Sequence, residues 1–411
     1  MKEIVYAMVI VILALTYLFD LWISLLNYRN RNAKIPQEVE DVYDQETYQK
    51  WLSYMMENYR IGLIQKSLNI IILLSFLVFG VFRWIGDTVE VATNNFFLQT
   101  FAFLSFYFIV EFLIGIGFSY YKQFSIEARY GFNKTTKKTF VLDKIKGILL
   151  FILLGGGFIY LLTLLYTKVH NLFYILAWAS IIVIILVVNL LYTKLIVPIF
   201  NKLTPLEEGS LKDKIIEFAK SVGYEVTKIS VMNASKRSTK LNAFFSGFGK
   251  MKQVVLYDTL IKKMTENQIV SVLAHEIGHA KHKDIIKNLL FTTLVLTVYI
   301  FVLWICLNSV VLHEAFGFGA VHFGFGLILF SIFISPIDRV LDIPLTFFSR
   351  KAEYAADKYA ADNGYPAAMI EALKELGRSN YANLTPHPVY VKMTYSHPPI
   401  GDRIRAIQKG M

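Results

Sequence analysis

Cysteine and charge are both scarce in this chain of 411 residues. Cys306 is the only cysteine, and it lies inside an apolar run. The sequence therefore contains neither a disulfide framework nor a cysteine-based metal site. Charged residues make up 18% of the chain and apolar residues 55%, whereas soluble domains average about 25% charged residues. These proportions exclude a disordered chain, a coiled coil and a disulfide scaffold, and they favour a polytopic membrane protein.

Seven apolar runs approach the ~20 residues that a helix needs to cross a bilayer. They cover about residues 4–27, 67–86, 96–120, 147–166, 171–195, 285–312 and 317–347. The fourth and fifth runs are separated by only a few residues, which predicts a tight helical hairpin. The seventh contains Pro336, Pro344 and several charges, which predicts a kinked helix that faces protein or water. The first run lacks a small-residue cleavage site, so we expect a retained span and not a signal peptide.

The distribution of Lys and Arg predicts how these spans are oriented. The four connections 28–66, 121–146, 196–284 and 348–411 carry 6, 7, 14 and 9 of these residues. The three others, 87–95, 167–170 and 308–316, carry 0, 1 and 0. The two groups alternate along seven spans, and cytoplasmic loops accumulate Lys and Arg. We therefore expect an external N-terminus and four cytoplasmic connections, so the net charge of +11 is a topology signal, not a sign of nucleic-acid binding.

Four charged residues fall inside the predicted spans, where an isolated charge costs free energy. They are Asp20, Glu111, Asp338 and Arg339. Two interpretations stay open: these side chains line a polar chamber among the helices, or they form local ion pairs or lie beyond the true ends of spans that are one turn shorter. The adjacent Asp338 and Arg339 are the hardest to explain by a misplaced boundary.

Residues 204–284 are predicted to form a small soluble module. The segment 204–209 has the features of a helix start, with Pro205 in the first turn, and an amphipathic helix follows over 211–221. Three β-like segments come next, at 228–232, 243–249 and 253–257. Thr265 and Gln268 then form a capping-box pattern, which predicts that another helix begins there.

That last helix contains His275-Glu276-Ile277-Gly278-His279. Residues i and i+4 share a helix face, so the imidazoles of His275 and His279 can converge on one zinc ion. Glu276 lies roughly 100° around the helix, where its carboxylate can flank the metal and take a proton from the attacking water. The pattern predicts metalloprotease chemistry with Glu276 as a catalytic residue. The alternative is a surface helix with chance histidines.

A catalytic zinc site needs a third protein ligand, and Glu353 is the candidate. It lies in a stretch of helical character with Asp357 at i+4. Glu353 would bind the metal, and Asp357 would accept the outward N–H of a zinc-binding histidine. The alternative is a solvated charged face with ordinary ion pairs. Two predicted spans separate His279 from Glu353, so both return to the same side of the membrane, which favours a shared site.

The ordered motifs of this chain resemble the type I CAAX prenyl proteases, which are integral-membrane zinc endopeptidases with seven spans. H-E-x-x-H alone occurs in many zinc proteases, whereas its combination with the other motifs is highly specific. The match extends over nearly the whole chain. It includes 127–133, 198–206, Asn242-Ala243-Phe244-Phe245, His275–His279, Glu353–Asp357, and Ser396-His397-Pro398-Pro399 followed by Arg403.

The resemblance implies an all-α polytopic membrane protein, with seven transmembrane helices around a large water-filled chamber. A gluzincin-type module of helices and a small β-sheet is expected on the cytoplasmic side. It implies an N-terminal membrane domain over 1–200 with spans 1–5, and a zinc metalloprotease domain over 201–411 with spans 6 and 7. One zinc ion per chain is expected, bound by His275, His279 and Glu353.

The resemblance also implies substrate-binding residues that spacing alone does not provide. His397 matches a family histidine that contacts substrate or stabilises the oxyanion, and it is therefore expected to be catalytic. Asn242 matches an asparagine that binds the substrate backbone. The peptide is expected to add as an extended strand beside the segment 243–249. Ala243, Phe244 and Arg403 complete the predicted substrate-binding set.

The expected function is zinc-dependent hydrolysis of peptide bonds, as in proteases that remove the C-terminal tripeptide of prenylated CAAX proteins. Two alternatives remain: a membrane-protein quality-control protease without a prenyl requirement, and a zinc-bearing transporter or scaffold. We expect a monomer that contacts membrane lipid and binds no nucleic acid. The Ile- and Lys-rich composition is typical of bacteria, which lack prenylated CAAX proteins. The expected location is therefore a bacterial cell membrane, or the endoplasmic reticulum membrane for a eukaryotic chain.

Overall fold

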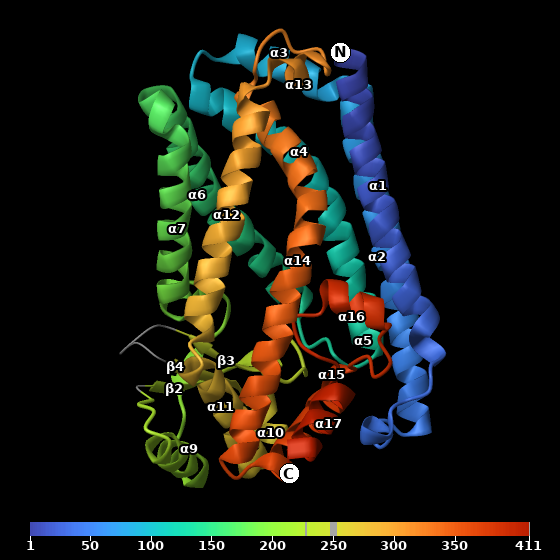
Figure 1. Cartoon of the computed structure of the whole chain (residues 1–411), viewed down its shortest axis with the longest axis vertical. Coiled ribbons are helices and arrows are strands. Elements are labelled where there is room, and N and C mark those ends of the chain that lie inside the picture. Colours follow the sequence, from blue (N-terminus) through green and yellow to red (C-terminus); the bar gives the residue numbers. More distant parts are fainter. Residues whose placement is uncertain (227, 247–252, 411) are drawn as a thin grey trace.

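The computed structural model describes residues 1–226, 228–246 and 253–410 and is mostly helical (Figure 1). Among these residues, seven long apolar helices run between the two ends of the molecule. They are α1 (Lys2–Arg29), α2 (Gln45–Val78), α4 (Phe96–Tyr121), α6 (Lys137–Val169), α7 (Phe173–Leu191), α12 (Asp284–Asn308) and α14 (Phe323–Asp362).

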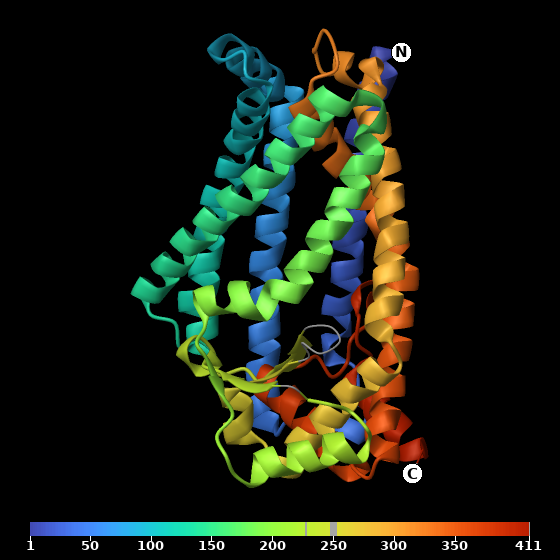
Figure 2. The ribbon, with the colours of Figure 1, turned by 90° about the vertical axis from the view of Figure 1, so that its left-hand side faces the viewer.

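The seven predicted spans are all present as helices. Six continuous segments of the described chain are long and apolar enough to cross a membrane, and one of them, 137–200, contains both α6 and α7. The chain reverses at His170, which has a φ of 31°, so these two helices form the expected hairpin (Figure 2). The prediction of a polytopic helical membrane protein is therefore confirmed.

The second span differs from its predicted bounds of 67–86. Its helix, α2, begins much earlier and ends at Val78. Gly80 has a φ of 67°, a left-handed conformation that glycine adopts without steric cost, and this residue interrupts the helix. The chain then forms α3 (Val81–Ala92), a separate amphipathic helix. The predicted run thus combined the end of a span with a short helix that lies at the end of the bundle near the N-terminus (Figure 1).

Helix α14 connects the membrane bundle to the rest of the molecule. It begins at Phe323, six residues later than predicted, because Gly317–His322 is irregular. It then runs through Pro336 and Pro344 without ending, and its axis bends in Figure 1, as expected for a kinked span. The helix continues well beyond the predicted end at 347, so Glu353 lies on the last span helix itself.

A small mixed sheet lies at the end of the bundle opposite the N-terminus (Figure 1). Its strand order is β1-β2-β4-β3, in which β2 and β4 are parallel and both edge strands are antiparallel to their neighbours. The strands are β1 (Leu203–Pro205), β2 (Lys228–Met232), β3 (Ala243–Ser246) and β4 (Gln253–Tyr257). Residues 247–249 of the predicted β-like segment lie outside the described residues.

The predicted helix start at 204–209 is wrong. Leu203–Pro205 instead pairs with β2, and the helix, α9, begins at Ser210. Pro205 cannot donate a hydrogen bond, but an edge strand tolerates this because only one of its sides is paired. Proline is common in both settings, so the local pattern could not distinguish them.

Short helices lie around the sheet and pack on a common apolar core. Buried members of this core include Ile215, Val254, Ile269 and Leu273. The capping box at Thr265 and Gln268 is present, with both hydrogen bonds formed. The helices are α9 (Ser210–Ser221), α10 (Asp258–Lys263), α11 (Glu266–Lys281), α15 (Pro366–Asn380) and α17 (Ile400–Gly410). Another short helix, α16 (Pro388–Thr394), packs against α14 and α1 instead.

Candidate active site

Two helices bring three potential metal ligands together. The Nε2 atoms of His275 and His279 on α11 lie 3.2 Å apart. Carboxylate oxygens of Glu353 on α14 lie 3.5 Å and 3.3 Å from these two nitrogens. Ligands about 2.0 Å from a tetrahedral zinc ion are separated by about 3.3 Å. The three side chains are therefore spaced as the ligands of one zinc ion would be.

The chemistry of the donor atoms also fits a cation. The Nδ1 atom of each histidine faces a carboxylate, so each ring can donate from Nδ1 and keep the lone pair of Nε2 free. Two such lone pairs facing each other repel unless a cation lies between them. Glu353 is buried, and its Oε2 accepts no hydrogen bond from the described residues, although Nη1 of Arg403 lies 3.3 Å from it. A buried carboxylate oxygen without a hydrogen bond is costly, and a metal ion would add a direct partner to this ion pair.

Gly278 permits the close approach of α11 and α14. A Cβ atom at this position would lie 3.0 Å from the Cα of Ala356 and 3.1 Å from the Cβ of Tyr359. Both neighbours are backbone or near-backbone atoms of α14, which cannot move aside as a flexible side chain can. The absence of a side chain at Gly278 therefore helps to bring Glu353 within reach of the two histidines.

Asp357 and Arg403 lie behind the ligand set. Asp357 is 1% exposed and accepts from Nδ1 of His275 at 2.8 Å, as its i+4 spacing from Glu353 predicted. Arg403 on α17 donates to both oxygens of Asp357, at 2.7 and 2.6 Å, and its Nη1 lies 3.3 Å from Glu353. Burial would lower the pKa of Arg403, but the carboxylates of Asp357, Glu353 and Glu276 together outweigh burial and raise it. These contacts orient the ligands, whereas the predicted role of Arg403 in substrate binding stays a prediction.

Asp284 makes a contact at the candidate site that the sequence did not indicate. Its buried carboxylate lies 3.0 Å from Nδ1 of His279, the counterpart of Asp357 at His275. Asp284 follows His279 by five residues, which is not a helical contact spacing. The contact forms because Lys283 adopts a left-handed conformation with a φ of 57°, which ends one helix and begins α12. A lone acid after a histidine-rich helix was the available signal, and it was too weak to identify this role.

Glu276 lies on α11 between the two histidines and interacts electrostatically with both of them. Burial raises the pKa of its carboxyl group, against the opposing effect of the neighbouring histidines. A carboxylate whose pKa is raised toward neutrality is a better proton acceptor. This is the property that the predicted catalytic role requires.

His397 and three of the predicted substrate-binding residues, Asn242, Ala243 and Phe244, occupy more open positions than Arg403. Nε2 of His397 lies 3.2 Å from Glu353, and its side chain is 63% exposed. Asn242 is exposed and immediately precedes β3, where Ala243 pairs with Leu256 of β4. Phe244 lies near Tyr257. The strand lies beside α11, so these residues are placed where the proposed roles need them, and the roles stay predictions.

Comparison with known proteins gives the family. Residues 24–202 match the family described as CAAX prenyl protease N-terminal, five membrane helices, and residues 205–410 match peptidase family M48. The chain belongs to the CAAX prenyl protease 1 family. It is 33% identical over 409 residues to the CAAX prenyl protease 1 homolog of Oryza sativa, covering 97% of this chain and 96% of that protein.

Two further comparisons extend over the whole fold. The chain is 30% identical to CAAX prenyl protease 1 of Saccharomyces cerevisiae, with 93% of this chain and 91% of that protein covered. The crystal structure of S. mikatae Ste24p superposes with a TM-score of 0.91 at 28% identity, covering 98% and 99% of the two chains. The chain is accordingly a zinc metalloendopeptidase of family M48, which confirms the predicted family, fold class and enzyme class. The candidate metal site is His275, His279 and Glu353.

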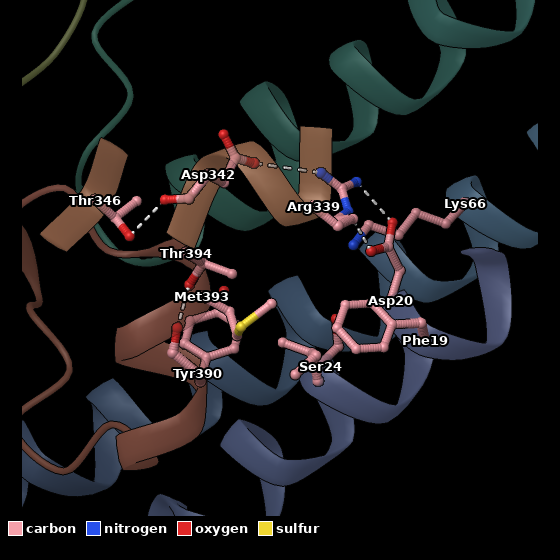
Figure 3. Close-up of a pocket in the computed structure, with 11 residues that line it drawn as sticks. Phe19, Asp20, Ser24, Lys66, Arg339, Asp342, Thr346, Tyr390, Met393 and Thr394 are labelled. Atoms are coloured by element: carbon pink, nitrogen blue, oxygen red, sulfur yellow. Dashed lines mark hydrogen bonds and ion pairs between the residues drawn. The ribbon is translucent and has the colours of Figure 1, made fainter. Parts of the chain in front are cut away.

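The charged residues within the spans of this family member have local partners. Arg339 on α14 donates to both oxygens of Asp20 on α1, at 2.7 and 2.9 Å. Asp338 accepts from Tyr299, and Glu111 accepts from Tyr107 of its own helix at 3.2 Å. The Asp20–Arg339 pair lines a cavity of about 260 Å³ between α1, α14 and α16 (Figure 3). Both open interpretations therefore hold in part, since this pair is satisfied and also faces a polar cavity.

Proposed function

We propose that this protease removes the C-terminal tripeptide of prenylated proteins, with its active site open to the cytoplasmic side of the membrane. The observation that carries the proposal is the full-length similarity to relatives named CAAX prenyl protease 1, including 96% of the rice protein. The cytoplasmic orientation is supported by the Lys and Arg distribution, because the four rich connections all lie on one side of seven spans.

The proposed site holds one zinc ion between His275, His279 and Glu353. The chemistry that zinc supplies in such a site is Lewis acidity, which polarises a peptide carbonyl and promotes deprotonation of water. Glu276 accepts the proton of the attacking water and returns it to the leaving amine. Its raised pKa suits both steps, because the group must first accept a proton and then give it up near neutral pH.

The substrate is proposed to bind along the edge strand β3. This strand is paired with β4 on one side, and among the described strands nothing pairs with its other side. An extended peptide can add there by main-chain hydrogen bonds. Asn242, Ala243 and Phe244 would contact its backbone and side chains. The exposed imidazole of His397 would stabilise the negative charge that develops on the scissile carbonyl oxygen.

A water-filled chamber within the helices is part of the proposal. In the most apolar 18-residue stretch of α1, α2, α4 and the α6–α7 segment, only 6–11% of the residues are buried within the protein. The corresponding fractions are 22% in α12 and 39% in α14. Helices that packed tightly on neighbours would bury a full stripe of residues. Sparse burial supports spans that face lipid outside and open space inside.

We also propose a division into a membrane domain over 1–200 and a protease domain over 201–411. The two family matches support it, because one ends at residue 202 and the other begins at residue 205. The second unit would then include α12 and α14, whose cytoplasmic ends carry Asp284 and Glu353. The zinc-site residues would thus all belong to one unit.

The test is peptide cleavage by the purified protein in lipid vesicles. A farnesylated CAAX peptide and its unprenylated counterpart are incubated with wild type and with Glu276→Gln, and tripeptide release is measured by mass spectrometry. We expect release from the farnesylated peptide by wild type alone. Equal cleavage of both peptides would favour the quality-control alternative. No cleavage of either peptide by zinc-replete wild type would contradict the proposal.

A further inference from the structure

The backbone just before β3 is held by an asparagine from a distant part of the chain. Asn380 is the last residue of α15. Its Oδ1 accepts from the backbone N–H of Leu241 at 2.8 Å, and its Nδ2 donates to the carbonyl of the same residue at 3.0 Å. The side-chain amide thus pairs with Leu241 as a neighbouring strand would. An amide is needed for this pairing, because it offers one donor and one acceptor side by side.

The residue on the N-terminal side of Leu241 is fixed as well. The ammonium group of Lys240 lies 3.2 Å from the buried carboxylate of Glu127 and donates to the hydroxyl of Tyr54 at 3.0 Å. It also lies 4.6 Å from the centre of the Phe132 ring, within the range of a cation–π interaction. Lys240 is therefore anchored to α2 and to the 127–133 segment.

The end of α15 is itself rigidly held, so Asn380 is a fixed point. The next residue, Tyr381, has a φ of 55° and ends the helix. Its ring makes edge contacts with Tyr43, Tyr54 and Phe132, with centroids 4.8–6.1 Å apart. Tyr381 therefore connects the aromatic side chains around Lys240 to Asn380, the residue that pairs with the backbone of Leu241.

These contacts converge on the residue that precedes the proposed substrate strand. Leu241 is 3% exposed, whereas Asn242 directly after it is exposed. The carbonyl of Asn242 accepts from the N–H of Tyr257, and its Oδ1 accepts from the N–H of Ala243 at 2.9 Å. Because Asn380 fixes the backbone of the buried Leu241, it also fixes the direction in which the backbone of Asn242 extends toward the surface.

We propose that Asn380 is a positioning residue for peptide binding, which fixes the backbone of Leu241 and thereby presents Asn242 and β3 to the substrate. The inference rests on the proposed function, since it takes Asn242 and β3 as the peptide-binding edge. It adds a residue that contacts neither the metal ligands nor the substrate strand itself. Because peptide is held at this edge before and during the reaction, loss of Asn380 weakens binding and leaves the chemical step intact.

The first measurement is peptide affinity in a background that does not cleave. A fluorescent farnesylated CAAX peptide is titrated into Glu276→Gln and into Glu276→Gln with Asn380→Ala, and anisotropy gives the two Kd values. We expect a Kd about tenfold higher without Asn380, because Asn242 and β3 are then no longer held in the position that the peptide requires. Asn380→Asp keeps the size of the side chain but opposes a carboxylate to the Leu241 carbonyl, so it should weaken binding at least as much as Asn380→Ala.

Asn363→Ala is the matched control, because Asn363 also ends a helix but donates only to Tyr359 of its own helix at 2.7 Å. Its Kd should equal that of the background. A Kd within twofold of the background for both Asn380 variants, with unchanged zinc content and melting temperature, would overturn the inference. This readout does not require cleavage, so it fails separately from the proposed function.

A second measurement separates positioning from a general structural role. In the active enzyme, Asn380→Ala should raise KM with kcat nearly unchanged. Combined with Asn242→Ala, it should add little to the KM increase of Asn242→Ala alone, because both changes remove the same contact with the peptide. A drop in kcat at constant KM, or fully multiplicative effects in the double variant, would show that Asn380 acts otherwise.

Discussion

Helices α11 and α6 are packed in opposite ways. Nine of the 16 residues of α11 are buried, whereas α6 buries two of its 33 residues, Leu162 and Thr163. Lipid surrounds apolar side chains as favourably as a neighbouring helix does, so a membrane helix can be stable without close partners. A helix in water has no such alternative. The zinc module, which consists of the sheet and helices α9–α11, α15 and α17, is therefore closely packed, whereas the span α6 is loosely packed. Other spans contribute to a second buried core that includes Phe82, Phe103 and Phe325.

This comparison predicts that changes in the zinc module are costly and that changes in loosely packed spans such as α6 are tolerated. Helix α14 belongs to both regions and is well buried at each end. Its first third buries eight residues, including Phe325 and Leu329, and its last third buries Glu353, Ala356, Asp357 and Ala360, while Val340 between them is 66% exposed. Substitutions along one chain can thus test the two regions under identical conditions.

The largest expected effect is that of Glu276→Gln. The change removes the proposed proton acceptor but none of the proposed zinc ligands, so kcat should fall by about 10²–10⁴-fold while zinc content stays the same. Steady-state cleavage of the farnesylated peptide and metal analysis of the same preparation measure both quantities. Wild-type turnover by this variant would refute the proposed mechanism.

The next largest effect is expected for Asp357→Ala. The change leaves the buried guanidinium of Arg403 without its principal partner, and such a loss costs about 3–5 kcal/mol of stability. It also frees the Nδ1 of His275, so zinc affinity should fall by about 10–100-fold. Thermal unfolding in detergent and competition with a chelator measure the two losses.

Asp362→Ala is the matched control for Asp357→Ala on the same helix. Asp362 pairs with Lys358, and both side chains are more than half exposed. Exposed pairs of this kind contribute about 0.3–0.5 kcal/mol, so the variant should retain nearly all its zinc and stability. Similar losses in the two variants would contradict the account of Asp357 as a ligand-orienting residue.

A pair of glycines compares the two regions directly. Gly278→Ala places a Cβ 3.0 Å from the backbone of α14 and should cost about 1–3 kcal/mol through overpacking, with a loss of activity as Glu353 moves. A Cβ added by Gly157→Ala in α6 meets nothing within 4 Å. This variant should leave kcat unchanged and the melting temperature unchanged or slightly raised. Equal sensitivity at both positions would show that the bundle is as tightly constrained as the zinc module.

The smallest effect is expected for Asp20→Asn. Its partner Arg339 is 38% exposed and lies 3.7 Å from Asp342, so a second carboxylate remains beside the guanidinium. Stability should fall by about 1 kcal/mol or less, with kcat and zinc content unchanged. A tenfold loss of activity would indicate that the α1–α14 contact governs the zinc site, contrary to the comparison above.

Much of this fold was predictable from the sequence because the strongest signals are periodic or compositional. The apolar runs predicted the spans, and the alternation of Lys and Arg placed all four long connections on one side of them. The i,i+4 spacing predicted that His275 and His279 share a helix face. The even number of intervening spans then indicated that Glu353 could join them, although the helix around it looked like an ordinary charged surface.

The residues that sequence reasoning missed depend on backbone geometry between elements. Asp284 reaches His279 only because Lys283 adopts a left-handed conformation. Asn380 reaches Leu241 across 139 positions of the chain. The sequence of the motif does not show that Gly278 must lack a side chain, because this requirement comes from the close contact with α14. Such contacts require the tertiary arrangement, and no local pattern encodes them.

We propose that one zinc site is shared by two helices, α11 and α14. Its ligands His279 and Glu353 are 74 residues apart in the sequence. The most direct test is the zinc content of wild type and Glu353→Ala, purified identically and dialysed against a weak chelator. We expect one zinc ion per wild-type chain and almost none in Glu353→Ala. A full zinc ion in Glu353→Ala, held as tightly as in wild type, would contradict the claim.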